Sequence, residues 1–243
     1  RRLTEARSQL VHSEKMASVG RMAAGGAHEI GNPIAAILGM EELLLDGDVA
    51  KEAQEDFLRR MKKETERIHR VLRDLLDFAR PERETVSEGA TPSASVRAVL
   101  DDVVGLLRPQ KEFREVEIAI EVDGDPLVRL APGRLTQVLL NLALNAGDAM
   151  ASPTGKAKGG RLVLRASRQD RTVRLEVEDT GAGVPAELRD RIFEPFVTTK
   201  EVGEGTGLGL AVCRGIIEGA GGTIALDATF AGGARFVVEL PEG

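Results

Sequence analysis

The chain has 243 residues, of which 42% are hydrophobic and 30% are charged, so it can build a packed core and is not expected to be disordered. Its 33 basic and 39 acidic side chains give a net charge of −6, which argues against a nucleic acid as a partner. The sequence has no apolar run of roughly 20 residues, so no membrane contact is expected in this segment. A single cysteine, Cys213, excludes an internal disulfide and favours a reducing, cytoplasmic location.

The first 80 residues are predicted to be helical. Apolar residues recur at helical spacing between Ile30 and Leu44, and Asp46-Gly47-Asp48 then breaks the pattern. A second helix, which Pro81 ends, follows with a heptad seam that has one polar member: Phe57, Met61, Glu64, Ile68, Val71, Leu75 and Phe78. We expect residues 1–80 to form a helical hairpin. A lone hairpin cannot cover its apolar face, so we expect it to pair with a second copy in a four-helix bundle.

The remaining chain has a different architecture. Residues 81–94 contain Ser, Thr, Gly and Pro and are predicted to be a linker. Beyond them, strand patterns cover residues 116–122, 162–166, 172–178, 223–226 and 235–240, and helical patterns cover residues 95–107, 134–151 and 207–219. This order predicts an α+β fold in residues 95–243, with helices covering one face of a sheet.

The segment His28-Glu29-Ile30-Gly31-Asn32-Pro33 carries the first candidate site. Glu29 can hydrogen-bond one ring nitrogen of His28, which leaves the other nitrogen free to act as a nucleophile. Asn32 lies one helical turn from His28 on the same face, and Pro33 is expected to bend the helix beside it. A surface histidine without a chemical role is the alternative, and this motif alone does not exclude it.

A polar stripe marks the predicted helix over residues 134–151. Its members are Gln137, Asn141, Asn145 and Asp148, and most of the other side chains in the helix are apolar. A helix that is apolar nearly all round is buried, so we expect an amide-lined wall inside the domain. Hydrated Mg²⁺ with triphosphate oxygens would satisfy those amides. The alternatives are an internal polar network and an ordinary solvent-facing stripe.

Two glycine-rich segments follow. Asp179 directly follows a predicted strand, where its carboxylate can accept a hydrogen bond from an exocyclic amine, and Gly181 and Gly183 allow a tight turn. Residues 203–210 run into a helix, so their backbone N–H groups can approach a phosphate. They do not form a Walker A loop, because no Gly-Lys-Ser/Thr follows. An ordinary turn and a surface loop are the respective alternatives.

The order of these motifs resembles the catalytic region of the two-component sensor histidine kinases. Residues 17–33 resemble the H box, 137–146 the N box, 179–183 the G1 box, 192–200 the F box and 205–210 the G2 box. The resemblance covers nearly the whole chain, and five motifs in one order are far more specific than any one of them.

The resemblance implies a fold and an activity. Residues 1–80 would be the dimerisation and histidine-phosphotransfer hairpin. Residues 95–243 would be an ATP-binding α/β sandwich of the gyrase, Hsp90, histidine kinase and MutL type, with a mixed sheet. The kinase would use ATP and Mg²⁺ to phosphorylate His28 and would pass the phosphoryl group to an aspartate of a response regulator receiver domain. It would act as a homodimer below an upstream sensor domain.

The resemblance also implies residue roles. Glu29 would orient His28 and take up its proton, and Asn32 would support a phosphatase activity toward the regulator. Asn145 would bind Mg²⁺ with Asn141 supporting it, and Asp179 would recognise the adenine amine. The lid would be shaped by glycines and packed at its hinge by two aromatic rings: Gly181, Gly183, Gly205, Gly207, Gly209, Phe193 and Phe196. The same resemblance places three more residues at the nucleotide: Lys200, Thr206 and Leu208.

The chain departs from the family pattern in two places. Asp148 stands where relatives often have a basic or amphipathic residue, and Ala220-Gly221-Gly222 replaces a usual His-Gly-Gly.

Two other functions compete with the kinase. An ATP hydrolase of the same fold is one alternative. Those hydrolases carry a water-activating glutamate where this chain has Asn141, and an amide cannot act as a general base. A non-enzymatic dimeric scaffold is the other, and the presence of His28, Asn145 and Asp179 speaks against it.

Overall fold

The structure is a computed structural model that describes residues 30–47, 49–79, 92–151, 159–200 and 205–243. For residues 70 and 73–79 it describes the backbone only. The chain divides into two compact units: Arg1–Glu82 with Glu194–Leu208, and Arg83–Phe193 with Gly209–Gly243.

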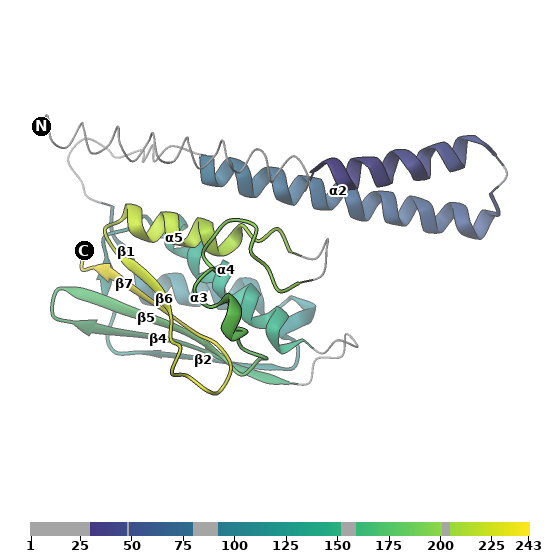
Figure 1. Cartoon of the computed structure of the whole chain (residues 1–243). Coiled ribbons are helices and arrows are strands. Elements are labelled where there is room, and N and C mark those ends of the chain that lie inside the picture. The colour runs from purple at the N-terminus through teal and green to yellow at the C-terminus, as the bar shows by residue number, and fades with distance from the viewer. Residues whose placement is uncertain (1–29, 48, 80–91, 152–158, 201–204) are drawn as a thin grey trace, which may run out of the picture. The chain divides into compact units, whose positions relative to one another are not determined.

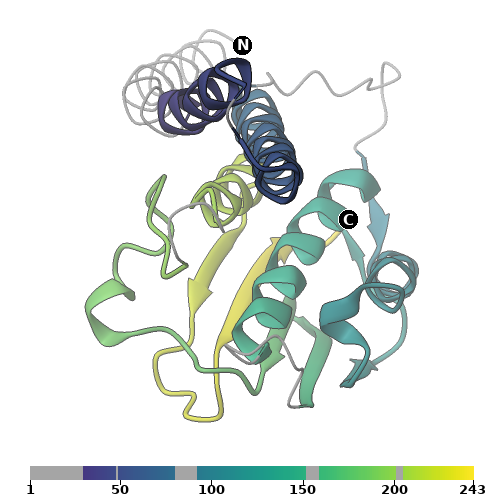
Figure 2. The same ribbon diagram turned by 90° about the vertical axis from the view of Figure 1, so that its right-hand side faces the viewer.

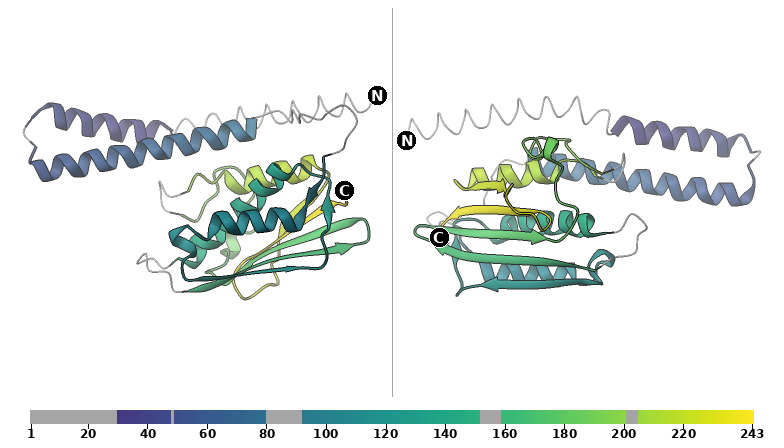
Figure 3. Two further views of the ribbon diagram at one scale, coloured as in Figure 1. Left: turned by 180° about the vertical axis from the view of Figure 1, so that it is seen from behind. Right: turned by 60° about the horizontal axis from the view of Figure 1, so that its bottom comes forward.

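The first unit contains a helical hairpin (Figure 1). Residues 30–45 are helical, and helix α2 spans Lys51–Ala79. Gly47 lies in the turn between them with φ at 77°, a conformation that glycine adopts at little cost. The two helices lie side by side in the views of Figure 3. The predicted hairpin is therefore confirmed for the residues that the structure describes.

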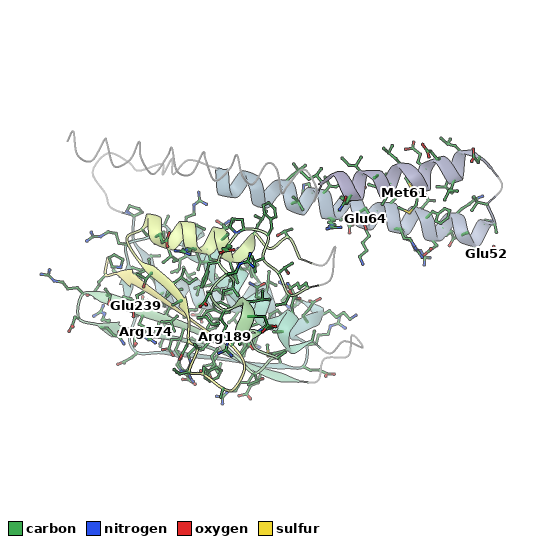
Figure 4. The ribbon with its side chains drawn as sticks, viewed as in Figure 1. Glu52, Met61, Glu64, Arg174, Arg189 and Glu239 are labelled. Carbon is green, nitrogen blue, oxygen red and sulfur yellow. The ribbon has the colours of Figure 1, made fainter. Side chains whose placement is uncertain are left out.

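The predicted seam of α2 faces inward, but much apolar surface on the hairpin remains exposed. Phe57, Met61, Glu64 and Ile68 are half-buried and Val71 is buried, whereas the side chains of Leu75 and Phe78 lie outside the described residues. Figure 4 labels Met61 and Glu64 on α2. Other large apolar side chains of the hairpin are open to solvent: Ile34, Leu38, Leu43, Leu45, Leu58 and Leu72.

The second unit is built on a mixed five-stranded sheet in the order β2-β4-β5-β7-β6. The strands are β2 (Val116–Val122), β4 (Gly160–Gln169), β5 (Thr172–Asp179), β6 (Thr223–Leu226) and β7 (Arg235–Pro241). β2 pairs with β4 in parallel and the other neighbours are antiparallel. A separate two-stranded sheet joins β1 (Ala94–Ser95) to β3 (Leu127–Val128).

Three helices cover one face of the five-stranded sheet (Figure 2). They are α3 (Val96–Leu107), α4 (Pro132–Met150) and α5 (Gly209–Gly219). Along β5, buried residues alternate with half-buried ones, so Val173, Leu175 and Val177 join the core beneath the helices. The opposite face carries charged side chains paired across the strands.

The α+β architecture agrees with the sequence prediction, and the differences concern element ends and four short elements, including β1 and β3. α4 begins at Pro132 rather than residue 134, because proline suits the first helical position, where no N–H bond is needed. β4 extends beyond the predicted 162–166, since backbone pairing with β2 and β5 continues where the apolar pattern stops. Two short 3-10 helices, η1 (Lys111–Phe113) and η2 (Ala186–Leu188), were not anticipated. Within the described part of the chain, no helix is long and apolar enough to cross a membrane.

Candidate nucleotide-binding site

The polar stripe of α4 is present and half-exposed. Gln137, Asn141 and Asn145 are partly buried and Asp148 is exposed, while the apolar side of the helix is in the core. The Arg134 guanidinium donates to the Gln137 side-chain oxygen at 3.2 Å. The predicted wall is thus not sealed inside the domain, because all four of these side chains keep some exposure to solvent.

The start of α5 lies beside this stripe. A Cβ built on Gly209 would lie 3.9 Å from Asn141 Nδ2. The buried Cys213 thiol, four residues further along α5, hydrogen-bonds with the Asn141 side chain and donates to the carbonyl of Val138 at 3.8 Å. Burial raises the pKa of Cys213 to about 12, so the thiol stays neutral and inert. The amino end of α5, which favours anions, therefore faces the amides of α4.

Asp179 is a buried carboxylate at the end of β5, with 2% of its surface exposed. Its Oδ1 accepts hydrogen bonds from the backbone N–H of Gly181 at 2.8 Å and of Ala234 at 3.3 Å. Burial raises the pKa of Asp179, and these two amides act in the opposite direction. Among the described residues, none donates to Oδ2. That oxygen is therefore the one available to a donor on a ligand.

The loop after β5 rests on the carboxyl end of α4. The N–H of Ala182 donates to the carbonyl of Ala149 at 3.2 Å, and a Cβ on Gly181 would lie 2.7 Å from the backbone of Ala149. Any side chain at Gly181 would push the loop away from α4. Since Ala149 is one helical turn beyond Asn145, the loop brings Asp179 and the amide stripe into one region of the domain.

The predicted lid segment uses its glycines for close backbone approach. Gly207 has φ at 63°, and a Cβ there would lie 2.5 Å from the backbone of Phe196. The Phe196 N–H donates to the Gly207 carbonyl at 3.0 Å, and Phe196 itself has φ at 66°. A Cβ on Gly205 would lie 2.9 Å from the Lys200 side chain. The segment is thus closely packed within itself.

The other predicted lid residues have local contacts. The Leu208 N–H donates to the Thr206 hydroxyl at 3.3 Å, and Leu208 is fully buried. Gly183 has φ at 71°, and a Cβ there would lie 2.9 Å from the Gly233 carbonyl oxygen. The Phe193 ring packs edge-on against Phe236, with centroids 6.3 Å apart.

The predicted phosphoacceptor region is described only in part. His28 and Glu29 lie outside the described residues, and so does most of the predicted linker over residues 81–94. Asn32 is exposed within the helix over residues 30–45, and Pro33 next to it is buried. Asn32 is therefore accessible to solvent.

Sequence reasoning missed the contribution of the residues just before β7 to the site. Ala234 both donates to Asp179 Oδ1 and accepts from the Asp179 N–H at 2.9 Å, although it lies 55 residues away. Gly233 precedes it with φ at 152°, and a Cβ there would collide with the Asp179 carbonyl oxygen. The Gly232-Gly233 pair was the available signal, because adjacent glycines before a strand often permit close backbone approach.

The described residues near the α4 amides offer few metal ligands, which suits a cation that takes most of its ligands from a bound nucleotide. Among the described residues, no group of three or more His, Cys, Asp or Glu side chains could hold a metal ion. The half-exposed Asn145 can offer one amide oxygen. Mg²⁺ accepts such an arrangement, because it keeps several waters and takes most other ligands from phosphate oxygens.

Comparisons with known proteins agree with the fold and the motifs. Residues 131–243 match the family model described as histidine kinase-, DNA gyrase B- and HSP90-like ATPase, and residues 18–84 match the His Kinase A (phospho-acceptor) domain. The sensor histidine kinase ZraS of Escherichia coli K12 is 34% identical over 96% of this chain and 48% of its own length. The sensor kinase CckA of Brucella abortus is 35% identical over 96% of this chain and 25% of its own. The chain thus spans from a quarter to about half of these relatives.

Solved structures lead to the same family. The nucleotide-free catalytic domain of the histidine kinase ThkA is 32% identical, with a TM-score of 0.54, over 62% of this chain and 94% of its own. ThkA in complex with the response regulator TrrA superposes with a TM-score of 0.76 over 100% of this chain and 67% of its own, at 26% identity. With a phospho-acceptor domain followed by an ATPase-type domain, this chain belongs to the sensor histidine kinases.

Proposed function

We propose that this chain is a catalytic core that transfers the γ-phosphoryl group of ATP to His28. The carrying observation is the buried Asp179, held by two backbone amides beside an amide-lined helix. An imidazole nitrogen of His28 forms the new N–P bond, the bond from the γ-phosphorus to the bridging oxygen breaks, and ADP leaves. Glu29 orients the ring and takes up its proton. The phospho-acceptor family model includes both residues.

The adenine would be recognised by Asp179. Its Oδ1 is occupied by Gly181 and Ala234, so Oδ2 would accept a hydrogen bond from the exocyclic amine. Asp179→Asn keeps an acceptor for the two backbone amides and turns the other group into a donor that faces the amine. We expect the affinity for ADP to fall about ten- to hundredfold. Unchanged affinity in a folded variant would remove Asp179 from the pocket.

Mg²⁺ would be bound through Asn145, with Asn141 supporting it. The ion would neutralise charge on the phosphates as the γ-phosphoryl group is transferred. Asn145→Ala should abolish the Mg²⁺-dependent part of ADP binding and leave the Mg²⁺-independent part. This is measurable by titrating fluorescent ADP with and without a chelator. Identical Mg²⁺ dependence in the variant would contradict the assignment.

A second copy of the chain would cover the exposed apolar face of the hairpin and form a homodimer. In the described part of the hairpin, six large apolar side chains are exposed, and the match to the phospho-acceptor domain covers these residues. Burying these side chains against a second copy would stabilise both. Analytical ultracentrifugation at micromolar concentration should show a dimer, and a stable monomer would contradict this proposal.

The phosphorylated histidine would then pass its phosphoryl group to an aspartate on a separate receiver domain. ThkA has been crystallised with the response regulator TrrA, which supports such a partner for this chain. The exposed Asn32 would hold a water in line with the aspartyl phosphate and so support dephosphorylation. Asn32→Ala should lower phosphatase activity while autophosphorylation persists. Loss of both activities, with weaker dimerisation, would favour a purely structural role.

ATP hydrolysis is the second candidate, because the ATPase-type family model also covers hydrolases. Asn141 occupies the place where those hydrolases carry a glutamate, and its amide cannot deprotonate water. Incubation with γ-labelled ATP separates the two functions. Acid-labile, base-stable label on the protein supports the kinase, whereas release of free phosphate without labelled protein supports the hydrolase.

A further inference from the structure

A cluster of ion pairs lies on the face of the sheet that is opposite to the helices. Glu178 of β5 forms an ion pair with Arg165 of β4, whose Nη1 lies 2.6 Å from Glu178 Oε2. It forms a second ion pair with Arg235 of β7, whose Nη2 and Nε lie 2.9 Å and 3.1 Å from the same oxygen. Burial acts to raise the pKa of Glu178, but the bonds from these arginines outweigh it and lower the pKa. The carboxylate is therefore ionised and firmly held.

Arg235 joins this cluster to the loop before β7. Its Nη1 lies 3.1 Å from Asp227 Oδ2, and its guanidinium stacks over the Phe230 ring, 4.2 Å from the centroid. On the face opposite to the helices, Arg235 thus contacts β5, the end of β6 and the loop between β6 and β7. Its side chain is 26% exposed and that of Glu178 is 15% exposed, so solvent screens the pair less than a surface pair.

The site residues lie directly behind this cluster. Glu178 and Arg235 are opposite one another in the ladder of β5 and β7. The next residue of β5 is Asp179, and the residue before Arg235 is Ala234, the donor to Asp179 Oδ1. Successive side chains on a strand point to opposite faces of the sheet. The Glu178–Arg235 ion pair and the Asp179 carboxylate therefore lie on opposite faces, but the same two backbone segments carry them. A shift of the Glu178–Arg235 pair would therefore act on the backbone that carries Asp179 and Ala234.

We propose that Arg235 is a positioning residue for nucleotide recognition. By binding Glu178 on the solvent face, it holds Ala234 against Asp179 on the helix-covered face and so fixes the orientation of the carboxylate. The oxygen that Asp179 offers to adenine then has one defined direction. This inference rests on the proposed role of Asp179, and it makes a half-buried arginine outside the pocket a determinant of selectivity for adenine.

The test compares the binding of ADP with that of inosine diphosphate, which has a carbonyl in place of the exocyclic amine. Calorimetry on the full chain gives both dissociation constants for the wild type, Arg235→Gln and Arg235→Lys. We expect Arg235→Gln to reduce the preference for ADP by about three- to tenfold, because a misaligned hydrogen bond loses part of its contribution. Arg235→Lys should restore part of the preference, since it keeps the charge but not the planar fork.

Arg174→Gln is the matched control. Arg174 lies on the same face of β5 and pairs with Glu176 at 2.8 Å and Glu239 at 3.1 Å, at the end of the strand away from Asp179. Figure 4 labels Arg174 and Glu239. Arg165 Nη1 also lies 3.9 Å from Glu176 Oε2, so this group of ion pairs adjoins the one around Glu178. We expect Arg174→Gln to change thermal stability about as much as Arg235→Gln but to leave the preference for ADP unchanged. Equal loss of preference in both variants would overturn the proposal.

Two further variants keep the outcome unambiguous. Glu178→Gln should reproduce the effect of Arg235→Gln, so the proposal can be tested even where Arg235→Gln does not fold. Asp179→Asn reports separately on the proposed function. If Asp179→Asn abolishes the preference for ADP while Arg235→Gln and Glu178→Gln retain it, the positioning role is wrong and the role of Asp179 stands. If Asp179→Asn retains the preference, the role of Asp179 itself is wrong.

Discussion

The two units bury their apolar residues in different ways. In the sheet unit, Leu135, Leu139 and Leu142 of α4 have at most 1% of their surface exposed. In the hairpin, Leu38 and Leu58 are 52% and 57% exposed. The sheet unit therefore contains a complete core of its own, whereas the hairpin offers apolar surface to a partner. This contrast suits an enzyme that combines a self-contained nucleotide domain with an association domain.

The ion pairs of the two units also differ, because those on α2 are local and several of those on the sheet join distant parts of the sequence. On α2, Arg60 pairs with Asp56 and Arg59 with Glu55, each one helical turn apart. On the sheet, Arg235 pairs with Glu178, 57 residues away. Local pairs support only the helix that carries them, whereas cross-strand pairs join segments that are distant in the sequence. Ion pairs of the sheet unit can therefore influence the site.

The largest expected effect is a loss of core packing in the sheet unit. Leu139→Ala should lower the free energy of unfolding by about 2–5 kcal/mol, because it leaves a cavity in a closed core. Leu58→Ala, at an exposed position of the hairpin, should change the free energy of monomer unfolding by less than about 0.5 kcal/mol. Urea unfolding at low protein concentration measures both. Equal effects would contradict the contrast between the units.

Next in size is the effect of a methyl group behind Asp179. In Gly233→Ala the added Cβ meets the Asp179 carbonyl oxygen at an unfavourable φ, so we expect a loss of about 2–3 kcal/mol and weaker ADP binding. Gly133→Ala is the control, because its Cβ meets nothing within 4 Å in the first turn of α4. There the substitution should be neutral or stabilise the protein by up to about 1 kcal/mol. Thermal unfolding and ADP titration separate the two, and full ADP affinity in Gly233→Ala would contradict the close approach.

A smaller effect concerns self-association. Leu38→Ala removes exposed apolar surface from the hairpin and should raise the dissociation constant of the proposed dimer about tenfold. Leu106 of α3 is also 51% exposed but belongs to the self-contained unit. Leu106→Ala should leave the dissociation constant unchanged in sedimentation equilibrium. A similar shift in both variants would show that the hairpin is not the association surface.

The smallest effects are opposite pH dependences of two adjacent carboxylates. The pKa of Asp179 is raised in the folded protein, so its ionisation removes stability as the pH rises from its ordinary value of 3.8 through the raised pKa. The pKa of Glu178 is lowered, so its stabilisation is complete above its ordinary value of 4.5 and is lost as the pH falls through the lowered pKa. Relative to the wild type, Asp179→Asn should therefore gain stability with rising pH, and Glu178→Gln should lose it. Denaturant unfolding between pH 3 and pH 7 gives both signs, and matching signs would contradict the two environments.

Local patterns predicted most elements of the fold. The alternation from Thr172 to Glu178 and the apolar seam of α2 depend on neighbouring residues, so period and turn residues are sufficient to find them. β1 and β3 are only two residues long and leave no periodic signal. Pairing with distant strands, which a local pattern does not contain, sets the true ends of β4.

The site was predictable where one motif carries its own chemistry. Asp179 and the amides of α4 were identified from residue type and position, and the structure brings their loop and helix together through Gly181 and Ala149. The contributions of Ala234 and Arg235 were not predicted. They arise from the antiparallel pairing of β5 with β7, across more than 50 residues of sequence. Such partners become visible only when the sheet order is known.

Labelling with γ-labelled ATP tests the central claim most directly. Wild-type protein incubated with Mg²⁺ and γ-labelled ATP should acquire label that is lost in acid and stable in base, as expected for a phosphorylated imidazole. His28→Gln should bind ADP as the wild type does and acquire no label, because the helix is kept and the nucleophile is removed. Label that persists on His28→Gln, or wild-type protein that binds ATP without becoming labelled, would contradict the account.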